Sequence, residues 1–420
     1  MSETEPMDVN ERRKYIHKMW GRYRKGNKAE KGRLLDEMEA VIGLHRKTLI
    51  RILNGRLSRK KRSHERGKTY GVEVDDAIRV IARSLDYPCA ERLRPNLVWM
   101  AEQLKRHGEL RVGKETLEQL EIVSVSTVKR ILKRVGRSEP KLAAKKPQRS
   151  QTNRLRKPYP MSRIPWDIAE AGHFEVDLVH HSGESAHGEY IHTLQMLDVA
   201  TGWGEIAAIL GRSHRVMTDG FDYLMARLPF AVIEIHPDNG AEFFNQFLLR
   251  YWKKKLPNLQ ITRSRPYQKN DNRFVEENNQ SLVRAYIGHG RLDTHAQLNV
   301  LRQLYEKLWL YHNFFQPVMR LQEKEYLTPV QYRRKYDQAR TPFDRLLEKG
   351  VLHADTKLHL FSLRDQTNPL ALRSQIDALI ALLLSLPVLD KTETVNIFET
   401  LTKEVDTSVT LSFEPTISIR

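Results

Sequence analysis

The stretch from residue 231 to 284 constrains the fold of this chain most, because strand and helix signals alternate in it around acidic residues. A short apolar run at 231–235 leads into His-Pro-Asp-Asn-Gly, which is typical of a buried strand ending in a turn and places Asp238 at the carboxyl end of that strand. A helical pattern ending in three lysines follows, then a second short strand at 259–262. A further helix begins after Asp271 and carries Glu276 near its start. This order of elements brings Asp238 and Glu276 together although they are far apart in the sequence.

A third acidic residue, Asp177, lies upstream in a segment with strand periodicity. Apolar residues at 174, 176 and 178 alternate with polar ones, so Asp177 faces away from the core if the apolar side is buried. Three carboxylates can lie close together only when protons or cations neutralise them. Mg²⁺ prefers oxygen ligands and needs one or two carboxylates per ion. The pattern therefore predicts that Asp177, Asp238 and Glu276 hold two Mg²⁺ ions, for which Mn²⁺ substitutes, in an in-line phosphoryl displacement.

The motifs around these acids are HFEVDLV, HPDNGAEFF and SRPYQKNDNRFVEENN. In this order they resemble the DDE transposases of bacterial insertion sequences, which have a retroviral-integrase-like catalytic core. The resemblance implies an α/β RNase H-like domain in which helices flank a mixed five-stranded sheet. It also implies that the three acids are catalytic, that hydrolysis frees 3′-hydroxyl ends of the element, and that these ends are then joined to target DNA.

Other polar residues near the three acids are expected to have lesser roles. Asp198 falls where the family has a turn residue, and we interpret it as structural. Asn239 and Glu242 flank Asp238 and are expected to orient its loop. Four histidines near the second strand are expected to be solvated loop residues rather than metal ligands: His180, His181, His187 and His192.

The charge of the chain is distributed unevenly. Lys and Arg outnumber Asp and Glu by 41 to 22 over residues 1–170, but by only 22 to 20 over 171–345, and they number 7 against 10 over 346–420. Because phosphate neutralisation by basic residues dominates nucleic-acid affinity, this asymmetry predicts a front half that binds double-stranded DNA. A single cysteine excludes disulfides and a Cys-rich zinc site. No signal peptide or membrane-spanning run is evident, so we expect a bacterial cytoplasmic protein associated with the nucleoid.

Domain boundaries follow from these patterns. We expect a helix-turn-helix at 1–70, a second helix-turn-helix-like helical domain at 71–137, a basic linker at 138–164, the catalytic domain at 165–320, and a mostly helical region at 321–420. The outward basic residues of each final helix are candidates for DNA contacts, although any small three-helix bundle has a similar pattern: Arg46, Lys47 and Arg51 in the first unit, and Lys129, Arg130, Lys133 and Arg134 in the second. Near Glu276, the residues expected to hold the scissile backbone are Arg263, Arg265, Lys269 and Arg273.

Two alternatives to a transposase remain open. An RNase H-like nuclease or resolvase would stop at hydrolysis, and a regulator derived from a transposase would bind DNA without catalysis. The presence of all three acids disfavours the regulator, and the two helix-turn-helix candidates disfavour the plain nuclease. Because transposition joins two DNA ends, at least a dimer on DNA is expected.

Overall fold

A computed structural model describes residues 9–55, 70–135, 160, 164–165, 167–265, 272–326 and 332–388. The chain divides into two compact units, Met1–Thr69 and Tyr70–Arg420. Each unit is described here by itself. None of the helices in the described ranges is both long and apolar enough to cross a membrane.

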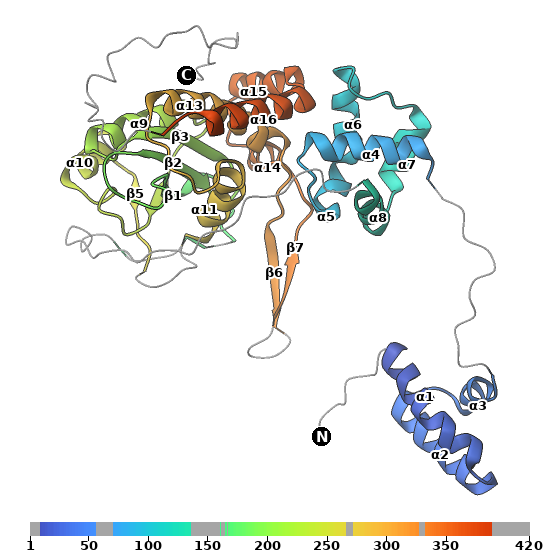
Figure 1. Cartoon of the computed structure of the whole chain (residues 1–420). Helices are drawn as coiled ribbons and strands as arrows, with labels where there is room; N and C mark the ends of the chain where they lie inside the picture. The colour runs from blue at the N-terminus through green and yellow to red at the C-terminus, as the bar shows by residue number, and fades with distance from the viewer. Residues whose placement is uncertain are drawn as a thin grey trace. The chain divides into compact units, whose positions relative to one another are not determined.

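The first unit contains three helices around a small core (Figure 1): α1 (Val9–Lys25), α2 (Lys28–Ile42) and α3 (Arg46–Asn54). A capping box between Asn27 and Glu30 starts α2, and Gly43 ends it in the left-handed conformation. The indole of Trp20 donates a hydrogen bond to the carbonyl of Leu53, which joins α1 to the end of α3. The three predicted helices are thus confirmed, while their assignment as a DNA-binding helix-turn-helix stays a prediction.

The second unit begins with five helices: α4 (Val72–Ser84), α5 (Ala90–Leu93), α6 (Leu97–Arg106), α7 (Lys114–Ile122) and α8 (Val125–Val135). Their apolar residues belong to the same hydrophobic core as the sheet that follows. Polar contacts reinforce this packing, because the Tyr311 hydroxyl donates to the Ser84 carbonyl at 3.0 Å and the Gln103 amide donates to the Arg364 carbonyl at 3.0 Å. This helical region is therefore part of the larger unit. Most of the basic linker expected at 138–164 lies outside the described residues.

The centre of the second unit is a mixed sheet of five strands: β1 (His173–His180), β2 (Ile191–Asp198), β3 (Gly204–Leu210), β4 (Glu234–Pro237) and β5 (Gln260–Ile261). Their order is β3-β2-β1-β4-β5. The first three strands pair antiparallel, whereas β4 pairs parallel with both β1 and β5. The five-stranded mixed sheet is confirmed, and its order is the one that an RNase H-like domain implies.

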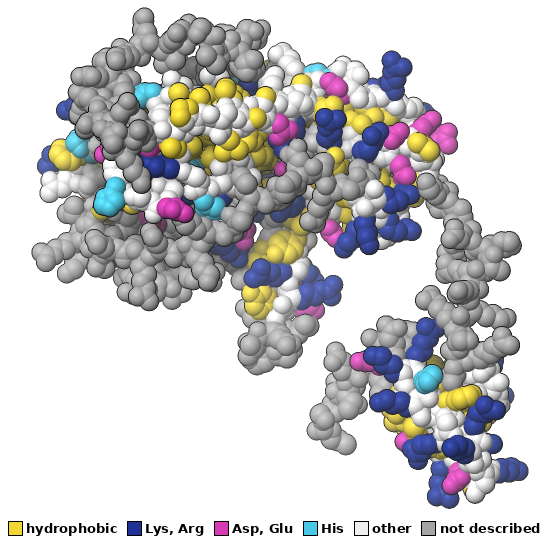
Figure 2. All heavy atoms as spheres, in the orientation of Figure 1, with side chains coloured by type: hydrophobic (Ala, Val, Ile, Leu, Met, Phe, Trp, Pro, Cys, Tyr) yellow, Lys and Arg dark blue, Asp and Glu magenta, His cyan; other side chains and the backbone are white. Residues whose placement is uncertain are grey.

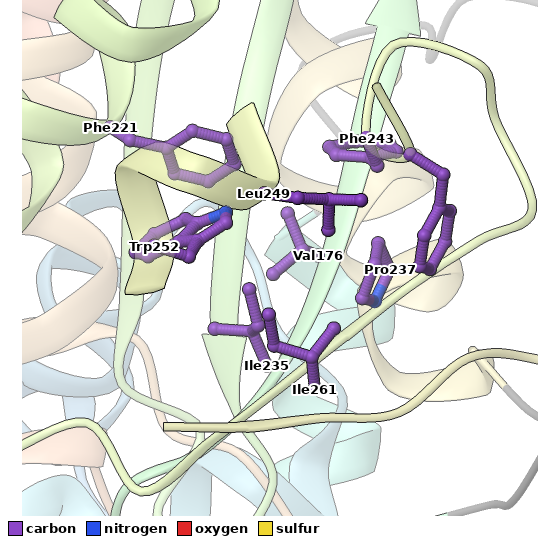
Figure 3. Close-up of a pocket in the computed structure, with 9 residues that line it drawn as sticks. Val176, Phe221, Ile235, Pro237, Phe243, Leu249, Trp252 and Ile261 are labelled. Carbon is purple, nitrogen blue, oxygen red and sulfur yellow. The ribbon is translucent and has the colours of Figure 1, made fainter. Parts of the chain in front are cut away.

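Helices cover both faces of the sheet. On one face, α9 (His214–Arg227) and α10 (Gln246–Lys255) pack against the apolar positions of β1 and β4, and Figure 3 shows Phe221 and Trp252 of these helices beside Val176 and Ile235. On the other face lie α11 (Arg273–Asn278), the π-helical segment η3 (Asn279–Arg284), α12 (Ala285–Ile287), α13 (His295–Leu310) and the π-helical segment η4 (Tyr311–Phe315). The small cavity in Figure 3 has only apolar lining residues, so it belongs to the core.

The C-terminal region contains an unpredicted hairpin. Strands β6 (Leu321–Tyr326) and β7 (Tyr332–Tyr336) pair antiparallel and precede α14 (Pro342–Lys349), α15 (Ala354–Gln366) and α16 (Pro369–Ser385). The described part of this region is mostly helical, as expected, because α14, α15 and α16 make up most of it. The hairpin was not predicted, because β7 is exposed along its length and lacks the alternation of apolar residues that identifies a half-buried strand in sequence. The apolar stripe of α16, for which a subunit contact was one interpretation, is buried within the chain. The helix expected from Thr328 starts outside the described residues, as does the tail from Thr407.

Candidate active site

The parallel pairing of β1 and β4 sets Asp177 beside Asp238. The register pairs Val176 with Pro237 as its last position, so the residues that follow on each strand are the two aspartates. Neighbouring strands lie about 4.8 Å apart, and side chains at the same level point to the same side. Asp238 lies directly beyond the carboxyl end of β4, where open α/β sheets bind their ligands, and Asp177 lies at the same level within β1. The backbone register thus puts the first two predicted acids on neighbouring chain segments.

The helix that carries Glu276 is docked on β1 by contacts on both sides of that residue. The amide N–H of Val275 donates to Oε2 of Glu175 at 2.8 Å, and Nδ2 of Asn279 donates to Oδ2 of Asp177 at 2.5 Å. Glu276 itself is exposed. Across the part of the chain that the structure describes, no three His, Cys, Asp or Glu side chains are grouped so that they could hold one metal ion. The fold therefore brings the helix to Asp177 but does not by itself converge the three carboxylates.

The surroundings of Asp177 raise the pKa of its carboxyl group. Burial is the largest influence on its carboxyl group and raises the pKa, and the nearby carboxylate of Glu242 raises the pKa further. Hydrogen bonds from the Leu178 amide, at 2.8 Å, and from Asn279 oppose this effect, as does the charge of Arg284. A buried carboxylate beside a second negative charge gains stability from a nearby cation.

The Asp-Asn-Gly turn brings a second carboxylate close to Asp238. The Gly240 amide donates to Oδ1 of Asp238 at 2.7 Å. A Cβ atom at Gly240 would lie 2.8 Å from that oxygen and 2.5 Å from Oε1 of Glu242, so a side chain at this position would force one or both carboxylates to move. The carboxylates of Asp238 and Glu242 thus lie on either side of Gly240, and that of Glu242 also acts on Asp177, but in the described residues these groups are not close enough together to hold one metal ion. Carboxylate oxygens are nevertheless the ligand type that a hard divalent cation such as Mg²⁺ or Mn²⁺ prefers. Glu242, expected only to orient the loop, also contributes negative charge to the site.

The turn is held in place by residues of the loop after β5. Nδ2 of Asn239 donates to the Ser264 carbonyl at 2.7 Å, and Nη1 of Arg263 donates to Oδ1 of Asn239 at 3.2 Å. Asn239 therefore orients the loop as predicted. Arg263 is buried and bonded to this turn, so it helps to hold the turn in place, and its assignment as a residue that holds the DNA backbone stays a prediction.

The other predicted DNA contacts differ in what surrounds them. Near Glu276, Arg265 is exposed, Arg273 is half-buried with its guanidinium 4.7 Å from the centre of the Phe274 ring, and Lys269 lies outside the described residues. In the helical regions, Arg46 forms an ion pair with Asp36, and Arg134 pairs with Asp75 at 3.0 Å. The remaining candidates are all exposed: Lys47, Arg51, Lys129, Arg130 and Lys133.

Glu175 is a site residue that the sequence analysis missed. Its carboxyl group is fully buried on the same side of β1 as Asp177 and accepts hydrogen bonds from the first turn of α11. Burial raises the pKa of Glu175 to about 8, even though the amides of Val275 and Phe274 and the charge of Arg320 oppose this rise. The alternation of side chains along a strand puts Glu175 and Asp177 on the same face of β1, and this pattern could have identified Glu175 from the sequence.

Two further groups are structural. Asp198 is buried and accepts hydrogen bonds from the Gly172 amide at 2.8 Å and from the Thr201 amide at 2.8 Å, as expected of a turn residue. The histidine prediction is wrong in part, because His181 and His192 are buried and burial lowers the pKa of both. The His192 ring stacks on a tyrosine, and His181 bonds to a threonine hydroxyl, so both stabilise β2 as neutral groups.

The strand order of the central sheet and two similar proteins indicate how this chain is related to others. The order β3-β2-β1-β4-β5, with three antiparallel strands followed by two parallel ones, is that of an RNase H-like fold. No family model matches the chain. The catalytic core domain of BIV integrase is similar over 43% of this chain and 97% of its own, with 15% sequence identity and a TM-score of 0.30, a likeness too weak to support any conclusion about function.

The relationship in sequence is much stronger. The chain is 34% identical over 307 residues to the uncharacterized protein y4rM of Sinorhizobium fredii, and the match covers 72% of this chain and 86% of y4rM. The chain therefore belongs to the same family as y4rM.

Proposed function

We propose that this protein is a DNA transposase, a polynucleotidyl transferase that frees 3′-hydroxyl ends of an element and joins them to target DNA. The observation that carries the proposal is the β1–β4 register, in which Asp177 and Asp238 directly follow the last pair, Val176 and Pro237. The helix that carries Glu276 lies next to them, and Asn279, directly after it, contacts Asp177. The sequence motifs around the three acids support the same assignment.

In this proposal, Asp177, Asp238 and Glu276 hold two Mg²⁺ ions. Bound there, the ions would supply activation of the attacking oxygen and stabilisation of the leaving one. The chain's own residues fix the ligands: Asn279 orients the carboxylate of Asp177, and the Gly240 amide orients that of Asp238. The helix of Glu276 continues into η3, and π-helical turns are frequent at functional sites.

Duplex DNA is the proposed partner, as transposon end and as target. Exposed basic side chains are the supporting feature, since Figure 2 shows Lys and Arg spread over the visible face of the N-terminal unit. Lys47 and Arg51 belong to this set. We further propose that the protein acts as at least a dimer on DNA in the bacterial cytoplasm, since two ends are joined in one event.

The test uses two neighbouring glutamates on one helix. Glu276→Gln removes the proposed ligand, whereas Glu277→Gln removes the same charge from the next exposed position. Pre-cut 3′-hydroxyl duplexes from the ends of the DNA segment that encodes the protein are incubated with Mg²⁺ and a supercoiled circular target. We expect joining to fall at least about 100-fold in the first variant and to be unchanged in the second.

Each other outcome has a distinct meaning. Undiminished joining by Glu276→Gln, with end binding intact, contradicts the metal role of this residue. Nicking of the wild-type substrate without any joining identifies a nuclease. Binding without either reaction identifies a regulator.

A further inference from the structure

The β6–β7 hairpin is an exposed element of the second unit. It extends away from the helices around it (Figure 1), and all five residues of β7 are exposed. Its base is closed by the Arg320 amide, which donates to Oδ1 of Asp337 at 2.7 Å, and by the guanidinium of Arg345, which lies 2.6 Å from the same carboxylate. The hairpin is therefore anchored at one end and solvated along its length.

One face of the hairpin is electrostatically balanced. Arg333 and Lys335 point to the same side, because side chains of a strand alternate. Nζ of Lys335 lies 2.9 Å from Glu323 and 3.7 Å from Glu325, and the register sets Glu325 opposite Arg333. On this face, Lys335 thus has acidic partners on β6, and an acidic residue stands opposite Arg333 in the register.

The other face carries Tyr332, Arg334 and Tyr336, and its charge has no acidic counterpart across the strands. Their register partners on β6 are Tyr326, Lys324 and Leu321. The Arg334 guanidinium lies 5.4 Å from the centre of the Tyr332 ring and donates to its hydroxyl at 3.0 Å, while both rings are more than 40% exposed. The face therefore presents two aromatic rings with a cation held between them.

These properties match a nucleic acid. An isolated two-stranded ribbon is marginally stable in water. Tyr332 and Tyr336 are 42% and 46% exposed, so part of their ring surface is open to a partner. A two-stranded ribbon fits the major groove of B-DNA. Arginine binds phosphate or guanine through its planar fork, and tyrosine hydroxyls bond to phosphate oxygens.

We infer that the face formed by Tyr332, Arg334 and Tyr336 is a binding surface for duplex DNA, with the ribbon lying in a groove and Arg334 as its cationic contact. This inference deepens the proposed function and rests on DNA being the partner. It assigns DNA contact to a C-terminal element, in addition to the basic residues of the first 170 positions.

Adjacent arginines provide the test. Arg334→Ala and Arg333→Ala each remove one positive charge, from opposite faces of one exposed strand. Binding of the full chain to a fluorescein-labelled, mixed-sequence duplex of roughly 30 base pairs, long enough for several phosphate contacts, is measured by anisotropy over a series of salt concentrations. We expect Arg334→Ala to weaken binding several-fold and to reduce the slope of log affinity against log salt by about 0.9. Arg333→Ala should leave both nearly unchanged.

A third variant separates charge from geometry. Arg334→Lys keeps the charge, so the salt slope should be retained while affinity falls through loss of the fork. Equal effects of Arg333→Ala and Arg334→Ala, or no effect of either, would overturn the assignment of this face while wild-type binding still supports a DNA partner. If the wild-type chain does not bind the duplex at all, the proposed function fails and this inference with it.

Discussion

Glu175 offers a quantitative test of how the helix of Glu276 is anchored. Its buried carboxyl group has a pKa of about 8 in the folded protein, whereas the ordinary value is 4.5. Between these values the folded chain retains a proton that the unfolded chain releases. Stability is therefore fully present below about pH 4.5 and is lost as the pH rises toward 8, by about 1.4 kcal/mol per pH unit.

Glu175→Gln removes the ionisation and keeps an acceptor oxygen for the Val275 amide. The difference in unfolding free energy between variant and wild type should therefore shift in favour of the variant by about 3 kcal/mol between pH 5 and pH 7.5. Urea unfolding followed by tryptophan fluorescence measures it, since Trp203 and Trp309 are buried in the same unit. Glu184→Gln, at an exposed loop position, is the control and should give a constant difference.

Parallel pH profiles for wild type and Glu175→Gln would refute this reasoning, because they would mean that Glu175 ionises in the folded protein as easily as in the unfolded one. Glu175→Ala provides a second measurement. It removes the acceptor as well, and an unsatisfied buried amide costs about 1–3 kcal/mol, so this variant should be less stable than Glu175→Gln at every pH.

Three further substitutions test the surroundings of the acids. Asn279→Ala, which removes the donor to Asp177, should weaken Mn²⁺ binding by about 10- to 100-fold in calorimetric titration without unfolding the protein. Gly240→Ala should lower DNA joining while leaving duplex binding intact, because the added methyl group meets the carboxylate of Asp238; normal joining would contradict the close packing of this turn. Asp198→Ala should destabilise the protein by about 2–4 kcal/mol in urea unfolding, since it leaves several buried donors without a partner.

The strands that position the site could be predicted because burial leaves a regular pattern in their sequence. Phe174, Val176 and Leu178 alternate with polar residues, and this pattern alone predicted β1 and the outward side of Asp177. The strand β4 begins at Glu234 rather than at residue 231, because the amides of Ile233 and Glu234 both bond to the Gly172 carbonyl before the ladder starts. The length of an apolar run does not report such a local contact.

Features that depend on tertiary contacts were not predictable in the same way. Glu175 has its role only because a helix about a hundred positions later ends its first turn against it. Arg263 looked like a DNA contact among other basic residues, but folding buries it against Asn239. The buried histidines were similarly hidden, because a polar residue in a strand gives no indication of which partner will satisfy it.

Gly172 allows two segments of the chain to approach closely just before β1 begins. It has a φ of +116°, and a side chain there would meet the Ala231 carbonyl at 2.7 Å, so only glycine allows the two chains to approach at this point. A slip of β1 by two residues would keep the apolar side chains on one face, yet it would place Glu175 or Asp177 differently opposite β4. The close approach at Gly172, the long register with β2 and the packing of Phe174, Val176 and Leu178 together hold Asp177 at its place.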